Sequence, residues 1–228
     1  GSTRAMSLPT DHPRLHKRPY SLGELLADGV VHAIALLAAI IGLAVLLLLV
    51  LMRRTGIEAS AVAIYAAALL AMFGFSAAYN LVPPSPLKWL LRRFDHSSIY
   101  LLIAGTYTPL LTQFHDQFWA WTLALVVWTG AIAGIVLKVA LPGKFDRLSI
   151  AIYLMLGWVA VVAIKPMIAS LPTPSVILIG VGGLLYSVGV LFYVWHKLKF
   201  QNAIWHSFVA GAAGCHYAAI AYCMTGAN

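Results

Sequence analysis

Charged residues are scarce in this chain: Asp, Glu, Lys and Arg make up 10% of its 228 residues, whereas 61% are hydrophobic. A soluble domain usually has about 25% charged residues and less than half apolar ones. This scarcity excludes an ordinary soluble domain, and the sequence offers no polar linker between two domains. Apolar runs of roughly 20 residues recur, each long enough to cross a bilayer as a helix. We therefore predict one all-α domain that crosses the inner (plasma) membrane several times.

Cysteines and acidic residues are also few, at two and seven. Cys215 and Cys223 both lie in the last apolar run without a pair-spaced motif, which argues against a disulfide framework or a zinc finger. The formal net charge is +8, but most Lys and Arg residues lie in short segments between apolar runs. Such charges orient a membrane protein and contact anionic headgroups. The expected partners are membrane lipids and not nucleic acid.

Prolines, glycines and short basic segments divide the apolar runs into seven. The predicted membrane-spanning helices are 24–52, 58–82, 95–114, 118–141, 148–170, 174–196 and 203–224. Between the second and third, PPSPLKWLLRRF is expected to stop one helix at its prolines and then form a short amphipathic turn at the interface. Residues 1–23 are read as a tag remnant, GSTRA, followed by an N-terminal arm, and residues 24–228 as the seven-helix domain.

The two ends of the predicted helices carry very different numbers of basic residues. Twelve Lys and Arg fall on the side of the N-terminal arm, and three fall on the other side, namely Arg53, Arg54 and Lys165. Cytoplasmic loops of membrane proteins carry the excess of Lys and Arg. We therefore predict a cytoplasmic N-terminus and, after seven crossings, a C-terminus outside.

Four predicted helices carry polar side chains near their cytoplasmic ends, where such groups are costly and functional by default. They are Glu24, Asp28 and His32 on the first helix, Ser76 and Asn80 on the second, Asp95 and His96 on the third, and Asn202 and His206 on the seventh. The first three recur every four residues and so share one helix face. Isolated polar groups would each lose hydration in the membrane, so we expect a shared polar cavity on the cytoplasmic side.

Several of these side chains also have simpler explanations. Glu24 lies near the membrane boundary and can extend into water, as can Lys138 at a loop end. Asp95 can be the N-cap of the third helix. His216, ten residues beyond His206, lies about 15 Å deeper and can hydrogen-bond across helices.

The residue types in this predicted cavity suit zinc chemistry. Zinc takes imidazole and carboxylate ligands and can lower the pKa of a bound water to near 7. His32, His96 and His206 are the candidate ligands, while Asp95 and Ser76 can position such a water or accept its proton. An asparagine is a poor zinc ligand because its oxygen is neutral.

Four stretches carry a resemblance to a known family: ELLADGVVHAIALLAAIIG, FSAAYN, RRFDHSSIYLLIAGTYTPLL and NAIWHSFVAGAAGCHY. Through them the chain resembles the haemolysin III family, the bacterial branch of the progestin and adipoQ receptor family. The resemblance covers nearly the whole chain and implies seven spans in the orientation predicted above. The wider family includes adiponectin receptors, is similar to alkaline ceramidases, and implies a zinc site on the cytoplasmic side.

The implied zinc pattern is only partly present in this sequence. Ser76, Asp95 and His206 match it, whereas Asn80 and Asn202 stand where the resemblance implies zinc-binding histidines. Either the site is rebuilt with residues such as His32, His96 or Asp28, or metal coordination has given way to amide hydrogen bonds.

Three functions and one structural alternative follow. The resemblance favours a role in membrane lipid or fluidity homeostasis. The alternative is a zinc-dependent hydrolase of lipid amides or esters, similar to ceramidases. A cytolysin or pore fits less well, because a pore needs polar residues along whole helices and the outer half here is apolar. A hydrogen-bonded network without a ligand is the structural alternative.

Overall fold

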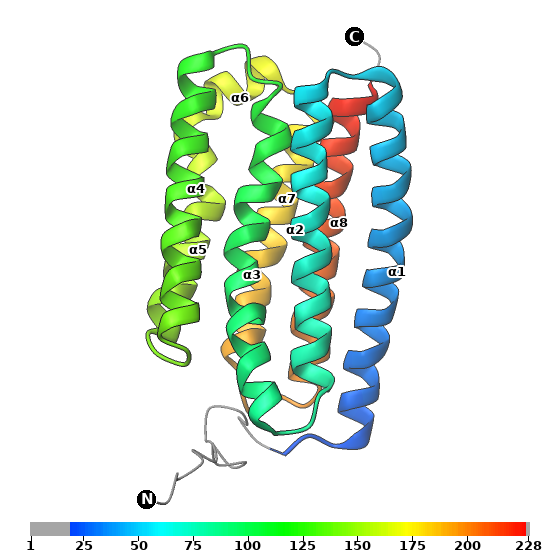
Figure 1. Ribbon diagram of the computed structural model, residues 1–228, viewed down its shortest axis with the longest axis vertical. Coiled ribbons are helices and arrows are strands. Elements are labelled where there is room, and N and C mark those ends of the chain that lie inside the picture. Colours follow the sequence, from blue (N-terminus) through cyan, green and yellow to red (C-terminus); the bar gives the residue numbers. More distant parts are fainter. Residues whose placement is uncertain (1–18, 227–228) are drawn as a thin grey trace, which may run out of the picture.

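The computed structural model describes residues 19–226, and every regular element in that range is helical. The elements are α1 (Leu22–Arg53), α2 (Gly56–Leu81), α3 (Pro86–Leu111), α4 (Gln117–Ala140), α5 (Asp146–Trp158), the 3₁₀ helix η1 (Val159–Ala163), α6 (Ile164–Ser170), α7 (Thr173–Val194) and α8 (Gln201–Thr225). The long helices run side by side along one axis (Figure 1). This confirms the all-α prediction, while the predicted tag remnant and most of the predicted N-terminal arm lie outside the described residues.

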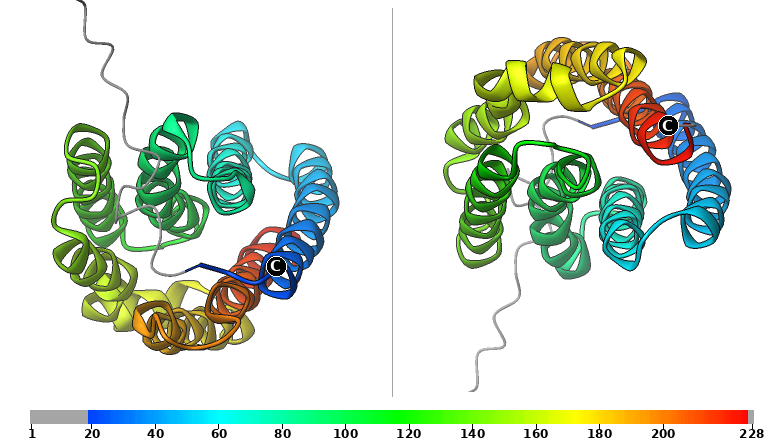
Figure 2. Two further views of the ribbon diagram at one scale, coloured as in Figure 1. Left: turned by 90° about the horizontal axis from the view of Figure 1, so that it is seen from below. Right: turned by 90° about the horizontal axis from the view of Figure 1, so that it is seen from above.

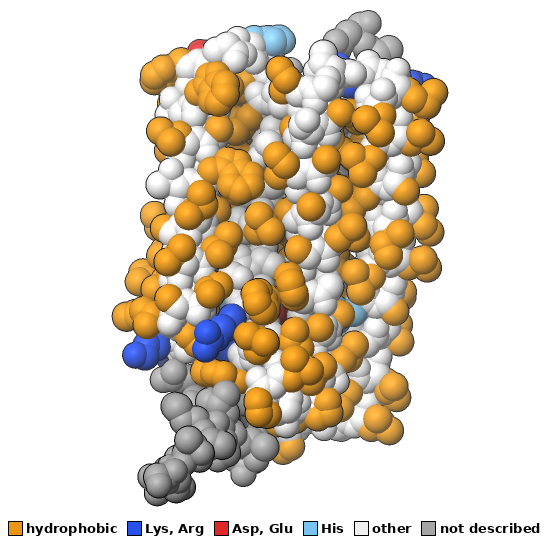
Figure 3. All heavy atoms as spheres, viewed as in Figure 1, with side chains coloured by type: hydrophobic (Ala, Val, Ile, Leu, Met, Phe, Trp, Pro, Cys, Tyr) orange, Lys and Arg blue, Asp and Glu red, His pale blue; other side chains and the backbone are white. Residues whose placement is uncertain are grey.

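Six helical segments are long and apolar enough to cross a membrane, namely α1, α2, α4, α5 with α6, α7 and α8. Hydrophobic side chains cover the visible face of the molecule, with Lys and Arg near the ends of the helices (Figure 3). α3 is also 26 residues long, but it is more polar than the other six. It packs between α2 and α4 (Figure 2), so much of its surface faces protein. The seventh crossing and the orientation of the termini stay predictions.

α3 begins nine residues before the predicted third span. The Ser85 side chain accepts a hydrogen bond from the Lys88 amide at 3.1 Å, and Pro86 occupies the first helical position, where it needs no hydrogen-bond donor. The separate amphipathic turn predicted for this segment is therefore wrong, because it is the first part of α3. Asp95 lies inside the helix and is not its N-cap.

The predicted fifth span is one continuous helical segment whose α-helical geometry is interrupted in the middle. α5 and α6 are joined by η1, a short 3₁₀ segment, and Pro166 lies in the first turn of α6. Proline lacks an amide hydrogen, and its ring crowds the carbonyl four residues earlier, here that of Val162. A 3₁₀ segment is a common way to accommodate such a change in backbone hydrogen bonding.

The first and last helices lie side by side (Figure 2) and are tied together at both ends. At one end, Glu24 Oε1 accepts a hydrogen bond from the amide of Phe200, just before α8. At the other end, the Arg54 guanidinium donates to the carbonyls of Cys223 and Met224, at 2.9 and 2.8 Å. This α1–α8 seam brings the polar residues of the first and last helices next to each other.

Candidate functional site

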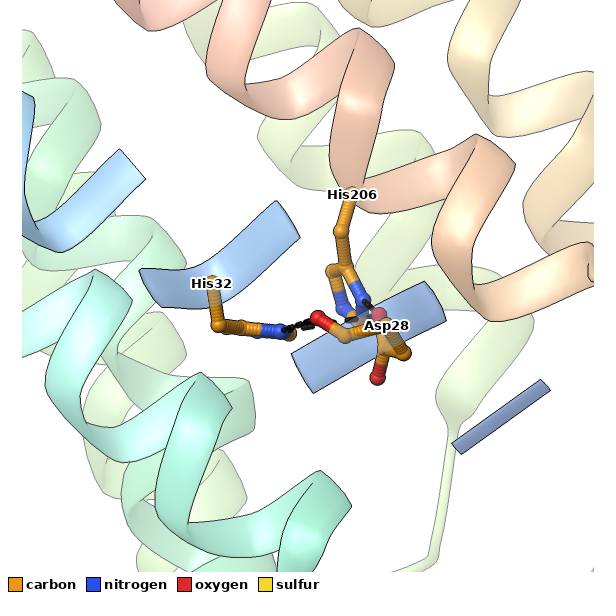
Figure 4. Close-up of side chains that lie close together, drawn as sticks. All are labelled: Asp28, His32 and His206. Atoms are coloured by element: carbon orange, nitrogen blue, oxygen red, sulfur yellow. Dashed lines mark hydrogen bonds and ion pairs between the residues drawn. The ribbon is translucent and has the colours of Figure 1, made fainter. Parts of the chain in front are cut away.

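Three titratable side chains meet at the α1–α8 seam (Figure 4). α1 supplies Asp28 and His32, one turn apart, and α8 supplies His206. One candidate ligand atom from each residue lies within 4.8 Å of those of the other two. The residues are only 3%, 2% and 8% exposed, respectively. Two imidazoles and a carboxylate buried this closely form a group that could hold a metal ion.

Ser76 of α2 joins these three residues through hydrogen bonds. Its Oγ lies 2.9 Å from His32 Nε2 and 3.3 Å from His206 Nε2. On the far side of the His206 ring, Nδ1 lies 2.6 Å from Asp28 Oδ1. We call Asp28, His32, Ser76 and His206 the Asp28 cluster. Helices α1, α2 and α8 each contribute to it, so its assembly depends on their packing.

Backbone and amide groups restrict the proton positions in the Asp28 cluster. His32 Nδ1 lies 2.9 Å from the backbone carbonyl of Asp28, which can only accept, so this nitrogen donates. His32 Nε2 therefore faces Ser76 as an acceptor when the ring is neutral. The Asn80 amide donates to the Ser76 carbonyl at 2.9 Å and lies 3.4 Å from Ser76 Oγ. The serine hydroxyl thus has three polar neighbours in a buried setting.

A small pocket reaches the Asp28 cluster from the ends of α1 and α8. It is lined by Tyr20, Glu24, Leu25, Asp28, Phe200, Asn202 and Ala203. Glu24 also closes a capping box with Ser21 and accepts the Phe200 amide, so its carboxylate helps to fix the wall of this pocket. Of the four cluster residues, Asp28 is the one that lines the pocket.

Asp95 and His96 lie outside the three-residue group that could hold a metal ion. His96 Nδ1 is 3.3 Å from the Asp95 carboxylate and 3.0 Å from the Arg92 carbonyl, and its ring packs edge-on against Tyr79. The sequence places these residues at the right depth. The rotation of α3 about its own axis cannot be deduced from this depth. In the structure, the two side chains contact each other, and His96 also contacts Tyr79 of α2. A role for Asp95 as a base stays a prediction.

A second polar group, which the sequence did not reveal, lies between α3, α4 and α5 and joins two buried basic side chains to a partly exposed carboxylate. Lys138 is 2% exposed and lies 2.8 Å from an Asp146 carboxylate oxygen, while Arg92 contacts the other oxygen at 2.9 Å. The expectation that Lys138 reaches water from a loop end is therefore wrong. Asp146 follows the short loop after α4 and lies eight residues after Lys138. An acidic and a basic residue on the two sides of a short loop were therefore the sequence feature that could have predicted this ion pair.

Comparison with known proteins places the chain in a family. Residues 24–217 match the family model described as Haemolysin-III related. The chain is 35% identical over 206 residues to the Hemolysin-3 homolog of Bacillus subtilis (strain 168), an alignment that covers 90% of this chain and 97% of that protein. It is 36% identical over 190 residues to Hemolysin-3 of Bacillus cereus, covering 83% and 87% of the two chains.

A more distant relative comes from an animal. The Monocyte to macrophage differentiation factor of Homo sapiens is 30% identical over 163 residues, covering 69% of this chain and 67% of that protein. No solved structure matches the chain. The family match includes all four residues of the Asp28 cluster and the apolar helices that surround it. The chain is therefore a multi-pass membrane protein that belongs to the haemolysin III family.

Proposed function

We propose that this protein hydrolyses ester or amide bonds of membrane lipids at the Asp28 cluster and so contributes to membrane lipid homeostasis. One observation carries the proposal: a buried serine hydroxyl lies within hydrogen-bond distance of two imidazoles, one of which is also hydrogen-bonded to a carboxylate. An imidazole in hydrogen-bond reach of a hydroxyl is the arrangement of a general base beside its proton donor. A carboxylate on the opposite ring nitrogen orients that base.

The position of the Asp28 cluster near one end of α1 supports a lipid substrate. Asp28 and His32 follow Leu22, the first residue of α1, by six and ten positions, which corresponds to about 9 and 15 Å along a helix. The polar interfacial layer of a bilayer is roughly 5–8 Å thick on each side, and acyl linkages lie near its inner boundary. The neighbouring residues Leu26 and Val30 are exposed apolar side chains that can contact an acyl chain.

Zinc is the metal that the donor set of Asp28, His32 and His206 fits best, because catalytic zinc sites combine imidazoles with a carboxylate. Zinc held there would supply a bound water as the nucleophile. However, Asp28 Oδ1 and His206 Nδ1 are 2.6 Å apart. Two ligands of one tetrahedral zinc lie about 3.3 Å apart, given bonds of about 2.0–2.1 Å. Zinc binding through these two atoms would therefore require this hydrogen bond to open.

The zinc site implied by the family resemblance fits this chain less well. Asn80 offers only a neutral amide, and its nitrogen donates to the backbone of Ser76. Asn202 lines the pocket beside Asp28. Asp95 is paired with His96. The hydrogen-bonded Asp28 cluster is therefore the basis of the proposed hydrolysis, with no step assigned to a metal.

The proposal can be tested in cells that lack this protein. We expect their phospholipid acyl composition to shift after a temperature change, relative to the parent cells. The wild-type protein should restore the parental composition, and the His206→Ala variant should not. The matched control is His115→Ala, a histidine on the loop between α3 and α4. An unchanged composition in the cells without the protein, or full restoration by the His206→Ala variant, would contradict the proposal.

A further inference from the structure

We infer that Ser76, His206 and Asp28 form a nucleophile–base–carboxylate triad, in which lipid esters or amides acylate Ser76. This inference rests on the proposed lipid hydrolysis and names its nucleophile. His206 contacts the other two residues through different ring nitrogens, with Nδ1 2.6 Å from Asp28 Oδ1 and Nε2 3.3 Å from Ser76 Oγ. The order carboxylate, imidazole, hydroxyl is the one that defines such triads on unrelated folds, where they are recognised by geometry and not by position in the sequence.

Asp28 determines how the His206 ring can act. An ionised carboxylate only accepts hydrogen bonds, so His206 Nδ1 donates to Asp28 and the lone pair of Nε2 faces the Ser76 hydroxyl. When the hydroxyl proton moves to Nε2, the ring becomes positively charged beside the carboxylate. Burial strengthens the attraction between these two charges, because the surroundings screen it less than water does. Asp28 is thus a positioning residue, and His206 is the general base.

His32 has a different role, although its Nε2 lies even closer to the hydroxyl, at 2.9 Å. Its Nδ1 is directed at the neutral backbone carbonyl of Asp28, and its distance to the Asp28 carboxylate is 3.5 Å. A carbonyl stabilises a positively charged ring less than a carboxylate at 2.6 Å does. The hydroxyl has a single proton, which it can donate to only one of the two neutral rings at a time. Transfer to His206 therefore occurs when the proton points toward that ring, and His32 is a positioning residue that keeps the Ser76 side chain between the two rings.

Asn80 supplies an amide donor beside the attacking oxygen. Its Nδ2 lies 3.4 Å from Ser76 Oγ, one helical turn further along α2. Amide N–H groups stabilise the negative oxygen of a tetrahedral intermediate when they are directed at the position of that oxygen. We assign this role to the Asn80 amide because it lies beside the attacking oxygen. A histidine at this position could coordinate a metal, whereas an asparagine offers hydrogen bonds without competing for the serine proton.

The proposed reaction has two balanced steps. In the first, Ser76 Oγ forms a bond to the acyl carbon and its proton passes to His206 Nε2. The bond from the acyl carbon to the alcohol oxygen or amine nitrogen then breaks, and His206 returns the proton to that leaving group. In the second step, water adds to the acyl-serine through the same base. The fatty acid leaves, and the Ser76 hydroxyl is restored.

The test uses the purified full-length protein in lipid nanodiscs and a long-chain alkyl fluorophosphonate, which phosphonylates activated serines with loss of fluoride. Mass spectrometry of the intact chain and of its peptides locates the adduct. We expect one adduct per chain, on Ser76, and none on the Ser76→Ala variant. Asp28→Asn should slow labelling by at least about 10²-fold, since the same change in a triad lowers catalysis by roughly 10⁴-fold.

Two further variants separate catalysis from folding. Ser97→Ala is the matched control, because Ser97 is also buried but donates to a carbonyl of its own helix, so it should label at the wild-type rate. Ser76→Cys keeps a nucleophile of similar size. Iodoacetamide should alkylate the thiol of the Ser76→Cys variant at least tenfold faster than the thiol of the double variant that also carries His206→Gln. Thermal unfolding of every variant reports whether the fold is retained.

Vesicle lipid hydrolysis, measured in parallel, distinguishes this inference from the proposed function. A folded wild-type protein without a Ser76 adduct would overturn the triad. Lipid hydrolysis that continues at the wild-type rate in Ser76→Ala would also overturn it, while leaving the proposed function intact. Labelling of Ser76 together with intact vesicle lipids would show an activated serine, but it would contradict lipid hydrolysis and the acylation of Ser76 by lipids.

Discussion

At the scale of single residues, the surroundings of Ser76 explain why polar side chains end the apolar helix α2. The serine hydroxyl meets both histidines, and Asn80 one turn later donates to the serine backbone and lies near its hydroxyl. A hydroxyl buried without partners would cost roughly 1–3 kcal/mol. Here the neighbouring helices supply the partners, so the polar end of α2 depends on α1 and α8.

Metal removal gives a prediction at this scale. We expect hydrolysis of vesicle lipids to survive prolonged chelation by EDTA, because the Asp28 cluster is joined by hydrogen bonds. Excess Zn²⁺ should slow fluorophosphonate labelling, since an ion bound by Asp28, His32 and His206 would occupy the base. Elemental analysis of the purified protein, before and after chelation, supplies the control. Activity that disappears on chelation and returns with one zinc per chain would favour the zinc mechanism instead.

The sequence predicted that Asp28, His32 and His206 lie close together, but not how they are connected. Spacing of four residues placed Asp28 and His32 on one face of α1, and depth placed His206 opposite them. Depth follows from the fixed rise of a helix, but rotation about the helix axis follows from packing against neighbours. For that reason the sequence grouped Asp95 and His96 with the others, whereas in the structure they pair with each other.

At the scale of helices, the α1–α8 seam is the element that assembles the site. Asp28 and His206 meet only because the first and last helices lie together, and this contact is reinforced by hydrogen bonds at each end. The helices themselves were predictable, because long apolar runs separated by prolines and basic loops are strong signals. The start of α3 was not, because two cap signals competed and the Ser85–Pro86 pair prevailed over Asp95.

The Arg54 end of the seam can be weakened selectively. Arg54→Ala removes two hydrogen bonds from a charged group to the last carbonyls of α8, so we expect a loss of about 1.5–3 kcal/mol of stability. The measurement is thermal unfolding of the purified protein in detergent. Arg53→Ala, which removes an exposed neighbouring charge, serves as the control and should leave the midpoint nearly unchanged. Equal effects of the two changes would contradict the role of Arg54.

Close packing of α2 against α3 gives a second prediction for the helices. A Cβ added at Gly105 would lie 2.7 Å from the Ala68 Cβ, an atom that cannot move without its backbone. Gly105→Ala should therefore destabilise the protein by about 1–3 kcal/mol. Gly74→Ala is the matched control, because nothing lies within 4 Å of its added Cβ. It should stabilise α2 by roughly 0.5–1 kcal/mol. Unfolding midpoints that do not separate the two variants would contradict this packing.

At the scale of the whole molecule, the protein combines an apolar exterior with a polar site near one end of the bundle. Six apolar helical segments account for the membrane location, and the pocket beside Asp28 opens where α1 and α8 begin. Hydrophobic side chains cover the length of the visible face (Figure 3). This arrangement suits a protein that acts on the lipids around it.

The same arrangement predicts that the protein does not form a pore by itself. We expect vesicles that contain the purified protein to retain an entrapped fluorescent dye as well as protein-free vesicles do. Over the described residues, the interior of the helix bundle is packed with large apolar side chains such as Leu46, Leu123 and Ile220, whereas a pore needs polar residues along whole helices. Dye release that increases with the amount of protein would contradict this expectation and favour a cytolytic role.

Release of fatty acid from vesicle lipids tests the central claim most directly, namely that the Asp28 cluster hydrolyses acyl bonds. Purified wild-type protein and the His206→Ala and His96→Ala variants would be placed in vesicles of defined phospholipids, and the products measured by mass spectrometry. We predict fatty acid release by the wild type and by His96→Ala, and a loss of at least about 10³-fold in His206→Ala, because His206 is the base that contacts both Asp28 and Ser76. Wild-type protein that releases no fatty acid, or equal release by all three proteins, would contradict the account.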